Sequence, residues 1–142
     1  MTNDTDNLRA ANLVRARGIF ERFLPLEPEW VAGLHPDLVM EFPFGSDVGL
    51  PAQIAGKEQC AGLFQLVFNK LGLHFHDIEV LGMADPDLVL ARYKGEGEFG
   101  DKLYRQSYLT LLGFKDEKLI LYREHVDTVI VEKTFGHLSA II

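Results

Sequence analysis

The stretch DLVLARYKGEGEFGDKLYRQSYLTLLGF, Asp87–Phe114, decides the fold, because both of its halves have the pattern of long β-strands. The three residues Gly100-Asp101-Lys102 between the halves form a turn signal. A connection this short joins strands that run antiparallel. The stretch therefore predicts an antiparallel pair of strands at 87–99 and 103–114.

Strand patterns also lie on both sides of this pair. We predict one strand at His74–Met83 and another at Leu119–Glu132, separated from the pair by turn signals at residues 84–87 and 115–118. All of the chain after residue 72 then consists of strands with short connections. This arrangement predicts a sheet that is mainly antiparallel.

Helical patterns dominate the first half of the chain. The clearest is Lys57–Leu71, where apolar residues recur at i, i+3, i+4, i+7, i+8 and i+11, and Gly72 follows as a C-terminal cap. Two further helices are predicted at Asp6–Leu24 and Glu29–Gly33, and one strand at Asp37–Phe44. Helices followed by strands predict an α+β fold, in which three helices cover one face of a twisted sheet and enclose an apolar cone.

Length and composition bound the class of protein. The 142 residues, 47% hydrophobic and 25% charged, predict one domain over residues 1–142, with a flexible polar start at 1–7. The net charge is -7 and no basic run occurs, so neither nucleic acid nor a membrane surface is expected as a partner. The single cysteine, Cys60, and the lack of a signal or membrane-spanning pattern predict a cytoplasmic protein.

Four motifs resemble one known family. They are MEFPFGSDVGLPAQIAGKE at Met40–Glu58, YKGEGEF at Tyr93–Phe99, YRQSYLTLLGF at Tyr104–Phe114 and LYREHVD at Leu121–Asp127. In this order they resemble the SnoaL-like polyketide cyclase family of the nuclear transport factor 2-like superfamily. The second half resembles the phenazine-biosynthesis A/B branch of that family.

This resemblance implies a cone-shaped α+β barrel. Its curved, mainly antiparallel mixed sheet would have three N-terminal helices over the concave face, with a pocket between them. The resemblance also implies a homodimer, and we expect the outer sheet face to form its interface. It implies no particular reaction, because the superfamily includes isomerases, cyclases, dehydratases, epoxide hydrolases and binding modules.

The resemblance points to Glu124 as a catalytic residue, since it matches a catalytic glutamate of the phenazine branch. Strand alternation places Glu124 on one face with Tyr122, and His125 with Asp127 on the other. Inside an apolar cone the pKa of a carboxyl group rises, which makes it a usable acid or base near neutral pH. The alternative role for Glu124 is an ion pair with Arg92, Lys94 or Arg105 on neighbouring strands.

Tyrosines and phenylalanines near Glu124 are candidates for ligand binding. The polar candidates could hold a polarised carbonyl group, and the aromatic ones could form the walls of the cone. The predicted ligand-binding residues are Tyr104, Gln106, Tyr108, Tyr122, Phe42, Phe44, Phe64 and Phe68.

Two pairs of residues that contain histidine are further candidate sites. His125 and Asp127 could form an acid–base dyad, and would become the site if the strand register ran the other way; alternatively they belong to a polar dimer interface. His74 and His76 are two residues apart on a strand, but no third ligand stands at a recognisable spacing. We therefore predict no metal site.

The sequence departs from the phenazine branch at one functional position. That branch uses a histidine of the third helix, whereas Lys57–Leu71 contains none. This difference favours a more apolar substrate. We expect a small enzyme without a cofactor that moves a proton on an apolar cyclic or carbonyl-bearing molecule, as an isomerase, cyclase or dehydratase does. The alternative is a non-catalytic binding or dimerisation module of the same fold.

Overall fold

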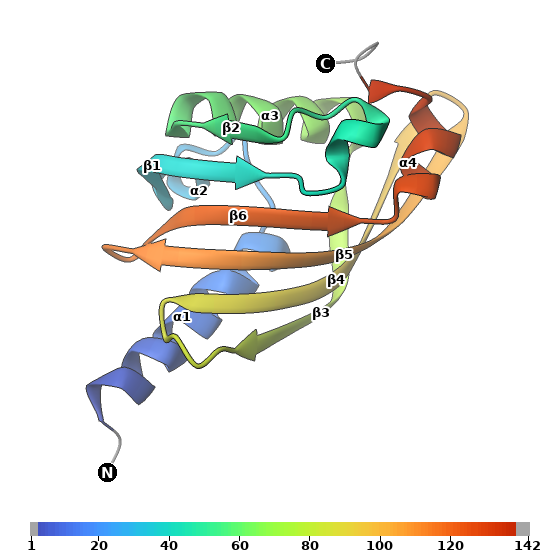
Figure 1. The fold of residues 1–142 in the computed structure, drawn as a ribbon. Coiled ribbons are helices and arrows are strands. Elements are labelled where there is room, and N and C mark those ends of the chain that lie inside the picture. The colour runs from blue at the N-terminus through green and yellow to red at the C-terminus, as the bar shows by residue number, and fades with distance from the viewer. Residues whose placement is uncertain (1–2, 139–142) are drawn as a thin grey trace.

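The computed structural model describes residues 3–138 and confirms the α+β fold (Figure 1). Its six strands are β1 (Leu34–Glu41), β2 (Gln53–Ala55), β3 (His74–Gly82), β4 (Leu88–Phe99), β5 (Lys102–Lys115) and β6 (Lys118–Val126). They form one sheet in the order β2-β1-β6-β5-β4-β3. Neighbouring strands are antiparallel except β1 and β6, which run parallel.

The helices are α1 (Asp4–Glu21), α2 (Pro28–Ala32), α3 (Lys57–Leu71) and α4 (Thr128–Phe135), with a short 3-10 helix η1 (Gly45–Val48). Helix α1 packs mainly against β3, and α3 packs against β1. The sheet curves round these helices, and the far ends of β4 and β5 reach α4 (Figure 1). No helix within residues 3–138 is long and apolar enough to cross a membrane.

The start of the chain is more ordered than its polarity predicts. Of the segment 1–7, residues 1–2 lie outside the described range, whereas 3–7 form the cap and first turn of α1. The Asn3 side chain accepts a hydrogen bond from the backbone N–H of Asp6 at 2.8 Å. This bond satisfies one of the free N–H groups at the helix start.

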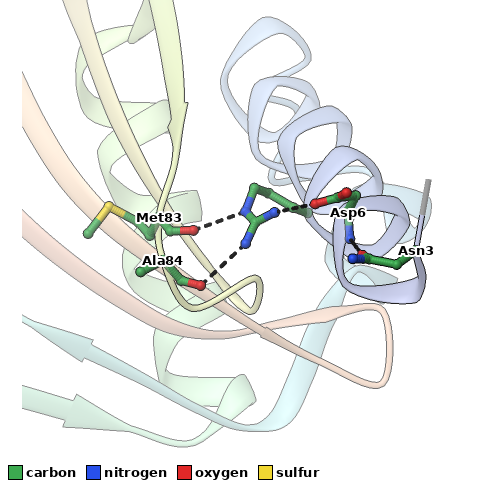
Figure 2. A network of polar contacts seen from close by, with 5 residues as sticks. Asn3, Asp6, Met83 and Ala84 are labelled. Carbon is green, nitrogen blue, oxygen red and sulfur yellow. Dashed lines mark hydrogen bonds and ion pairs between the residues drawn. The ribbon is translucent and has the colours of Figure 1, made fainter. Parts of the chain in front are cut away.

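Hydrogen bonds from the Arg9 side chain connect this end of α1 to the turn between β3 and β4 (Figure 2). Its guanidinium donates to the backbone oxygens of Met83, at 3.0 Å, and Ala84, at 3.3 Å. The same group pairs with Asp6 at 3.0 Å. Gly82 lies beneath the Arg9 side chain, since an added Cβ would stand 2.9 Å from its Cδ.

The core lies between the helices and the concave sheet face. The Tyr93 and Tyr108 rings stack there with centroids 4.9 Å apart, and Phe20 of α1 lies 3.9 Å from Tyr93. Gly97 of β4 lets the end of α3 come close, because an added Cβ would stand 2.6 Å from the Leu71 backbone oxygen. The sheet and α3 are therefore in direct contact at this end of the core.

The last predicted strand is wrong over its second half. We expected a strand over Leu119–Glu132, but β6 ends at Val126 and α4 begins at Thr128. The Asp127 carboxylate caps this helix by accepting the N–H groups of Val129 at 3.0 Å and Ile130 at 3.4 Å. The β-branched residues that follow Asp127 favour a strand by their intrinsic propensity. The Asp127 cap outweighs this preference and stabilises a helix.

Candidate functional site

A cavity of about 130 Å³ lies between α3, α4 and the concave sheet face. Its wall is mainly aliphatic and aromatic, with Phe42, Phe64 and Phe75 among its lining residues. The ionisable lining residues are Glu124, Lys70, Tyr104, Tyr108 and Tyr122. The site is therefore an apolar cavity with a few polar groups, the usual composition of a small-molecule site.

Strand β6 points Glu124 into this cavity, on the face it shares with Tyr122 and Val126. Within residues 3–138 its carboxyl group forms no hydrogen bond or ion pair. Removal from bulk water disfavours the charged form and raises the pKa of Glu124 from 4.5 to about 7. The side chain keeps partial exposure because the cavity opens to solvent at its mouth.

The ion-pair alternative for Glu124 is wrong, because its three candidate partners lie on the opposite face of the sheet. Arg92 pairs with Glu79 at 3.2 Å, and Arg105 approaches Glu96 at 3.7 Å. Lys94 follows Tyr93, whose ring is buried in the core, and therefore points outward as well. Glu124 thus faces the cavity on the side of the sheet opposite these three basic residues.

Tyrosine hydroxyls occupy the polar part of the cavity and the core behind it. Tyr104 and Tyr108 share a hydrogen bond of 3.2 Å. Tyr122, which also lines the cavity, bonds to Tyr93 at 3.1 Å, and Tyr93 bonds to Thr110 at 2.7 Å. Burial raises the pKa of each of these tyrosines, that of Tyr104 to about 12. They remain neutral at physiological pH and can act as hydrogen-bond donors.

Gln106 has a different place from the one predicted for it. Its side chain is buried but does not line the cavity. The amide nitrogen donates to the Asp127 backbone oxygen at 2.9 Å, and the amide oxygen accepts the N–H groups of Asp127 at 2.8 Å and Ser107 at 2.9 Å. Gln106 therefore holds the junction of β6 and α4 rather than a ligand.

Two of the four predicted aromatic wall residues also lie elsewhere. Phe42 and Phe64 line the cavity. Phe44 is 59% exposed, and its ring lies 5.4 Å from that of His125 outside the cavity. Phe68 packs against Phe23, with centroids 6.0 Å apart, and is not a lining residue. The chain leaves the strand before Phe44, so strand alternation no longer applies to that residue.

The structure does not bring His125 and Asp127 together as a dyad. The His125 ring lies on the outer face, with Nδ1 3.3 Å from the Leu109 backbone oxygen. The Asp127 carboxylate caps α4, and no bond joins the two side chains in the described part of the chain. Neither residue lines the cavity.

His74 and His76 flank one carboxylate at the edge of the sheet. Their Nε2 atoms lie 3.8 Å and 3.6 Å from the carboxylate oxygens of Glu96. Among residues 3–138, no group of three or more ligand-type side chains has an arrangement that could hold a metal ion.

Sequence reasoning missed much of the cavity lining, including a whole helix and a lysine. Helix α4 supplies Val131 and Phe135, which could not be placed while that segment was assigned to a strand. Lys70 also lines the cavity. It follows Leu63 and Val67 at i+7 and i+3 along α3, so the helical stripe carries a signal that could have identified it.

No protein-family model matches the chain. An uncharacterised PhzA/B-like protein of Pseudomonas aeruginosa is 32% identical over 98 residues, which are 67% of this chain and 68% of that protein. The chain belongs to the PhzA/B-like family. This assignment confirms the resemblance to the phenazine-biosynthesis A/B branch that the sequence motifs carry.

Solved structures place this PhzA/B-like protein among SnoaL-like, nuclear transport factor 2-like folds. A phenazine biosynthesis-related protein from Pseudomonas aeruginosa is 17% identical with a TM-score of 0.78, over 94% of this chain and 90% of that one. A candidate SnoaL-like polyketide cyclase from Jannaschia is 15% identical with a TM-score of 0.73, over 95% and 98%. At such identities the likeness shows the fold.

Several of the fold neighbours are named as enzymes. Besides the cyclase they include an epoxide hydrolase-like protein from M. tuberculosis, 22% identical with a TM-score of 0.68 over 97% of this chain and 89% of that one. The names of these neighbours thus include an assigned isomerase, an assigned cyclase and an epoxide hydrolase.

Proposed function

We propose that the protein is a small acid–base enzyme that moves a proton on an apolar cyclic compound bearing a carbonyl group. Glu124 is the group that takes and returns the proton, as in an isomerase, cyclase or dehydratase. The observation that carries the proposal is a carboxyl group without an ion-pair partner in the described chain, facing an apolar cavity, with its pKa raised to about 7.

A pKa near the working pH suits a group that must both accept and donate a proton. Near neutral pH about half of the Glu124 side chains are ionised and can accept a proton from the carbon beside a carbonyl. The protonated carboxyl can then return that proton to another carbon of the same molecule. The transfer is redox-neutral, and side chains of the described cavity suffice for it, so the proposal includes no cofactor.

The tyrosines assist by stabilising the charge that develops on the carbonyl oxygen. Removal of a proton beside a carbonyl leaves negative charge on that oxygen, and neutral hydroxyl groups stabilise it by hydrogen bonding. Tyr104, Tyr108 and Tyr122 line the same cavity as Glu124. One of the Tyr104 and Tyr108 hydroxyl groups donates a hydrogen bond to the other. The accepting hydroxyl keeps its own proton, which it can donate to a ligand.

The size of the cavity restricts the substrate. Its volume of about 130 Å³ is close to the ~150 Å³ of an apolar protein cavity that accommodates benzene. A compound with a single ring is therefore the expected ligand, and larger fused-ring compounds require movement of the lining side chains.

A second candidate function is ligand binding without catalysis. The observation that favours it is the absence of histidine among the described lining residues, since a histidine would supply a second group that titrates near neutral pH. Without such a group in the described lining, every proton-transfer step of a catalysed reaction would depend on the Glu124 carboxyl group alone.

We also propose that two copies associate through the outer sheet face. That face carries the exposed apolar side chains of Leu81, Leu103 and Leu109, with Phe44 exposed next to His125. A second copy would remove this surface from water. Light scattering tests the proposal, and a single species of 16.0 kDa, the mass of one chain, would refute it.

A ligand screen followed by an exchange assay tests the proposed activity. Single-ring ketones are screened by thermal shift on the wild type and on Glu124→Gln, and the hits are incubated in D2O while deuterium uptake beside the carbonyl is recorded. We expect uptake with the wild type and with Glu132→Gln, whose side chain is exposed on α4, but not with Glu124→Gln. Binding without uptake in any variant would favour the second candidate.

A further inference from the structure

A surface groove of about 360 Å³ lies between the C-terminal ends of α1 and α3, beside the start of β3. Its lining includes Leu24, which is 48% exposed, and the partly exposed ring of Phe68. Neither residue lines the cavity that holds Glu124. The groove is therefore a hollow of its own on the described surface, with apolar side chains open to solvent.

Three side chains form the wall between this groove and the cavity. Phe23, Leu73 and Phe75 line both spaces. A residue that lines two spaces borders each of them, so the wall is one side chain thick. Phe23 is 7% exposed and Leu73 is 4% exposed, and the ring centroids of Phe23 and Phe75 lie 4.9 Å apart. The wall is therefore closed in this structure.

Irregular backbone carries most of this wall. Phe23 lies between the end of α1 and the start of α2, in a segment that is neither helix nor strand. Leu73 follows Gly72, whose left-handed backbone with φ 60° caps α3. Phe75 belongs to β3, an edge strand with a register shift after His76. Such backbone has fewer hydrogen bonds to hold it, so it opens locally at a lower cost than the centre of the sheet.

Phe68 supports the wall from the groove side. Its ring centroid lies 6.0 Å from that of Phe23, and the two rings meet edge to face. On β3 the ring of Phe75 meets Phe23 in the same manner. Turning the Phe23 ring aside breaks these aromatic contacts, and they therefore set part of the barrier to opening.

We propose that the groove between α1 and α3 is a second passage into the cavity, with Phe23, Leu73 and Phe75 as its gate. A compound enters from the groove when the Phe23 ring turns aside, and the wall closes behind it. The inference concerns access to the cavity, so it does not depend on the proton transfer proposed for Glu124.

Exchange NMR with fluorobenzene tests the passage. An apolar cavity of ~150 Å³ accommodates benzene, so this probe suits a cavity of about 130 Å³. Nuclear Overhauser contacts with Val131, which lines the cavity but not the groove, show whether the probe is inside. Fluorine exchange measurements then give the rates of entry and exit and the Kd of the probe.

Two matched alanine variants compare the groove with the α4 side of the cavity. Phe68→Ala removes the ring beside Phe23, and Phe99→Ala removes a ring 5.2 Å from that of Phe135. Phe68 and Phe99 are both partly exposed and outside the cavity lining, whereas Phe23 and Phe135 line it. We expect Phe68→Ala to raise both rates together by about 2- to 12-fold, the equivalent of one aromatic pair, with Kd unchanged. Phe99→Ala should change neither rate.

Phe68→Trp supplies a second variant that keeps an aromatic ring at this position. Its larger side chain fills more of the groove, so it should lower both rates. The inference is overturned if the entry rate is unchanged in the Phe68 variants, or if exchange becomes faster in Phe99→Ala alone, which would place the route beside α4. Probe contacts in the groove only, or no binding at all, would show that an apolar ring does not reach the cavity and would also overturn it.

Discussion

Replacing Glu124 by Gln should change how the stability of the protein depends on pH. The carboxyl group has a pKa of about 7 in the folded protein and 4.5 as its reference value. Between these values the unfolded chain releases the proton while the folded chain keeps it. The free energy of unfolding of the wild type therefore falls as pH rises through this window, and the Glu124→Gln variant lacks that fall.

The size of the effect follows from the separation of the two pKa values. The interval from 4.5 to about 7 is about 2.5 pH units, and each unit corresponds to about 1.36 kcal/mol. The wild type should lose at most about 3 kcal/mol relative to Glu124→Gln between about pH 4.5 and pH 8. Water in the open cavity screens the charge, so this figure is an upper bound.

Urea unfolding of both proteins across this pH range measures the difference. Any fixed cost of burying the glutamine amide cancels, because only the change of the difference with pH is read. The three tyrosines of the lining, whose pKa values burial raises, stay neutral throughout this window. Parallel stability curves would show that Glu124 is not desolvated in the cavity, and the reasoning would fail.

Three further predictions concern the fold that positions the site. Asp127→Ala should cost about 1 kcal/mol of unfolding free energy by removing the cap of α4, while Asp127→Asn keeps most of it; equal losses in urea unfolding would contradict the capping role. Gly97→Ala should cost about 1–3 kcal/mol, because its Cβ meets the Leu71 backbone oxygen, whereas Gly62→Ala, with open space in α3, should stabilise by about 0.5–1 kcal/mol; thermal unfolding of both variants checks the contrast. Arg9→Ala should lower stability by about 1 kcal/mol and speed amide exchange at the β3–β4 turn, and unchanged exchange would argue against its fastening role.

Sequence patterns predicted the elements whose signals are local and redundant. Helix α3 has the predicted bounds, Lys57–Leu71, because a continuous apolar stripe and a glycine cap indicate the same helix. Alternation also grouped Glu124 with Tyr122, and both side chains line the cavity. The catalytic role of Glu124 stays a prediction, since geometry shows where the carboxyl group lies and not what it does.

The missed features depend on contacts between distant parts of the chain. Alternation places Gln106 inward correctly, but no pattern reveals that its amide bonds to the backbone of Asp127, 21 residues away. The helix α4 was missed because the β-branched residues after Asp127 favour a strand, while one capping carboxylate and the packing of Val131 on the cavity favour a helix. Tertiary contacts decided both cases.

The titration of the Glu124 side chain tests the central claim most directly. Carboxyl-carbon NMR on protein labelled at glutamate, with Glu124→Gln used to assign the signal, follows this one group as pH changes. We expect a midpoint near pH 7. A midpoint near the reference value of 4.5 would mean that the carboxyl group is solvated and fully ionised at neutral pH, and would contradict the proposed proton transfer.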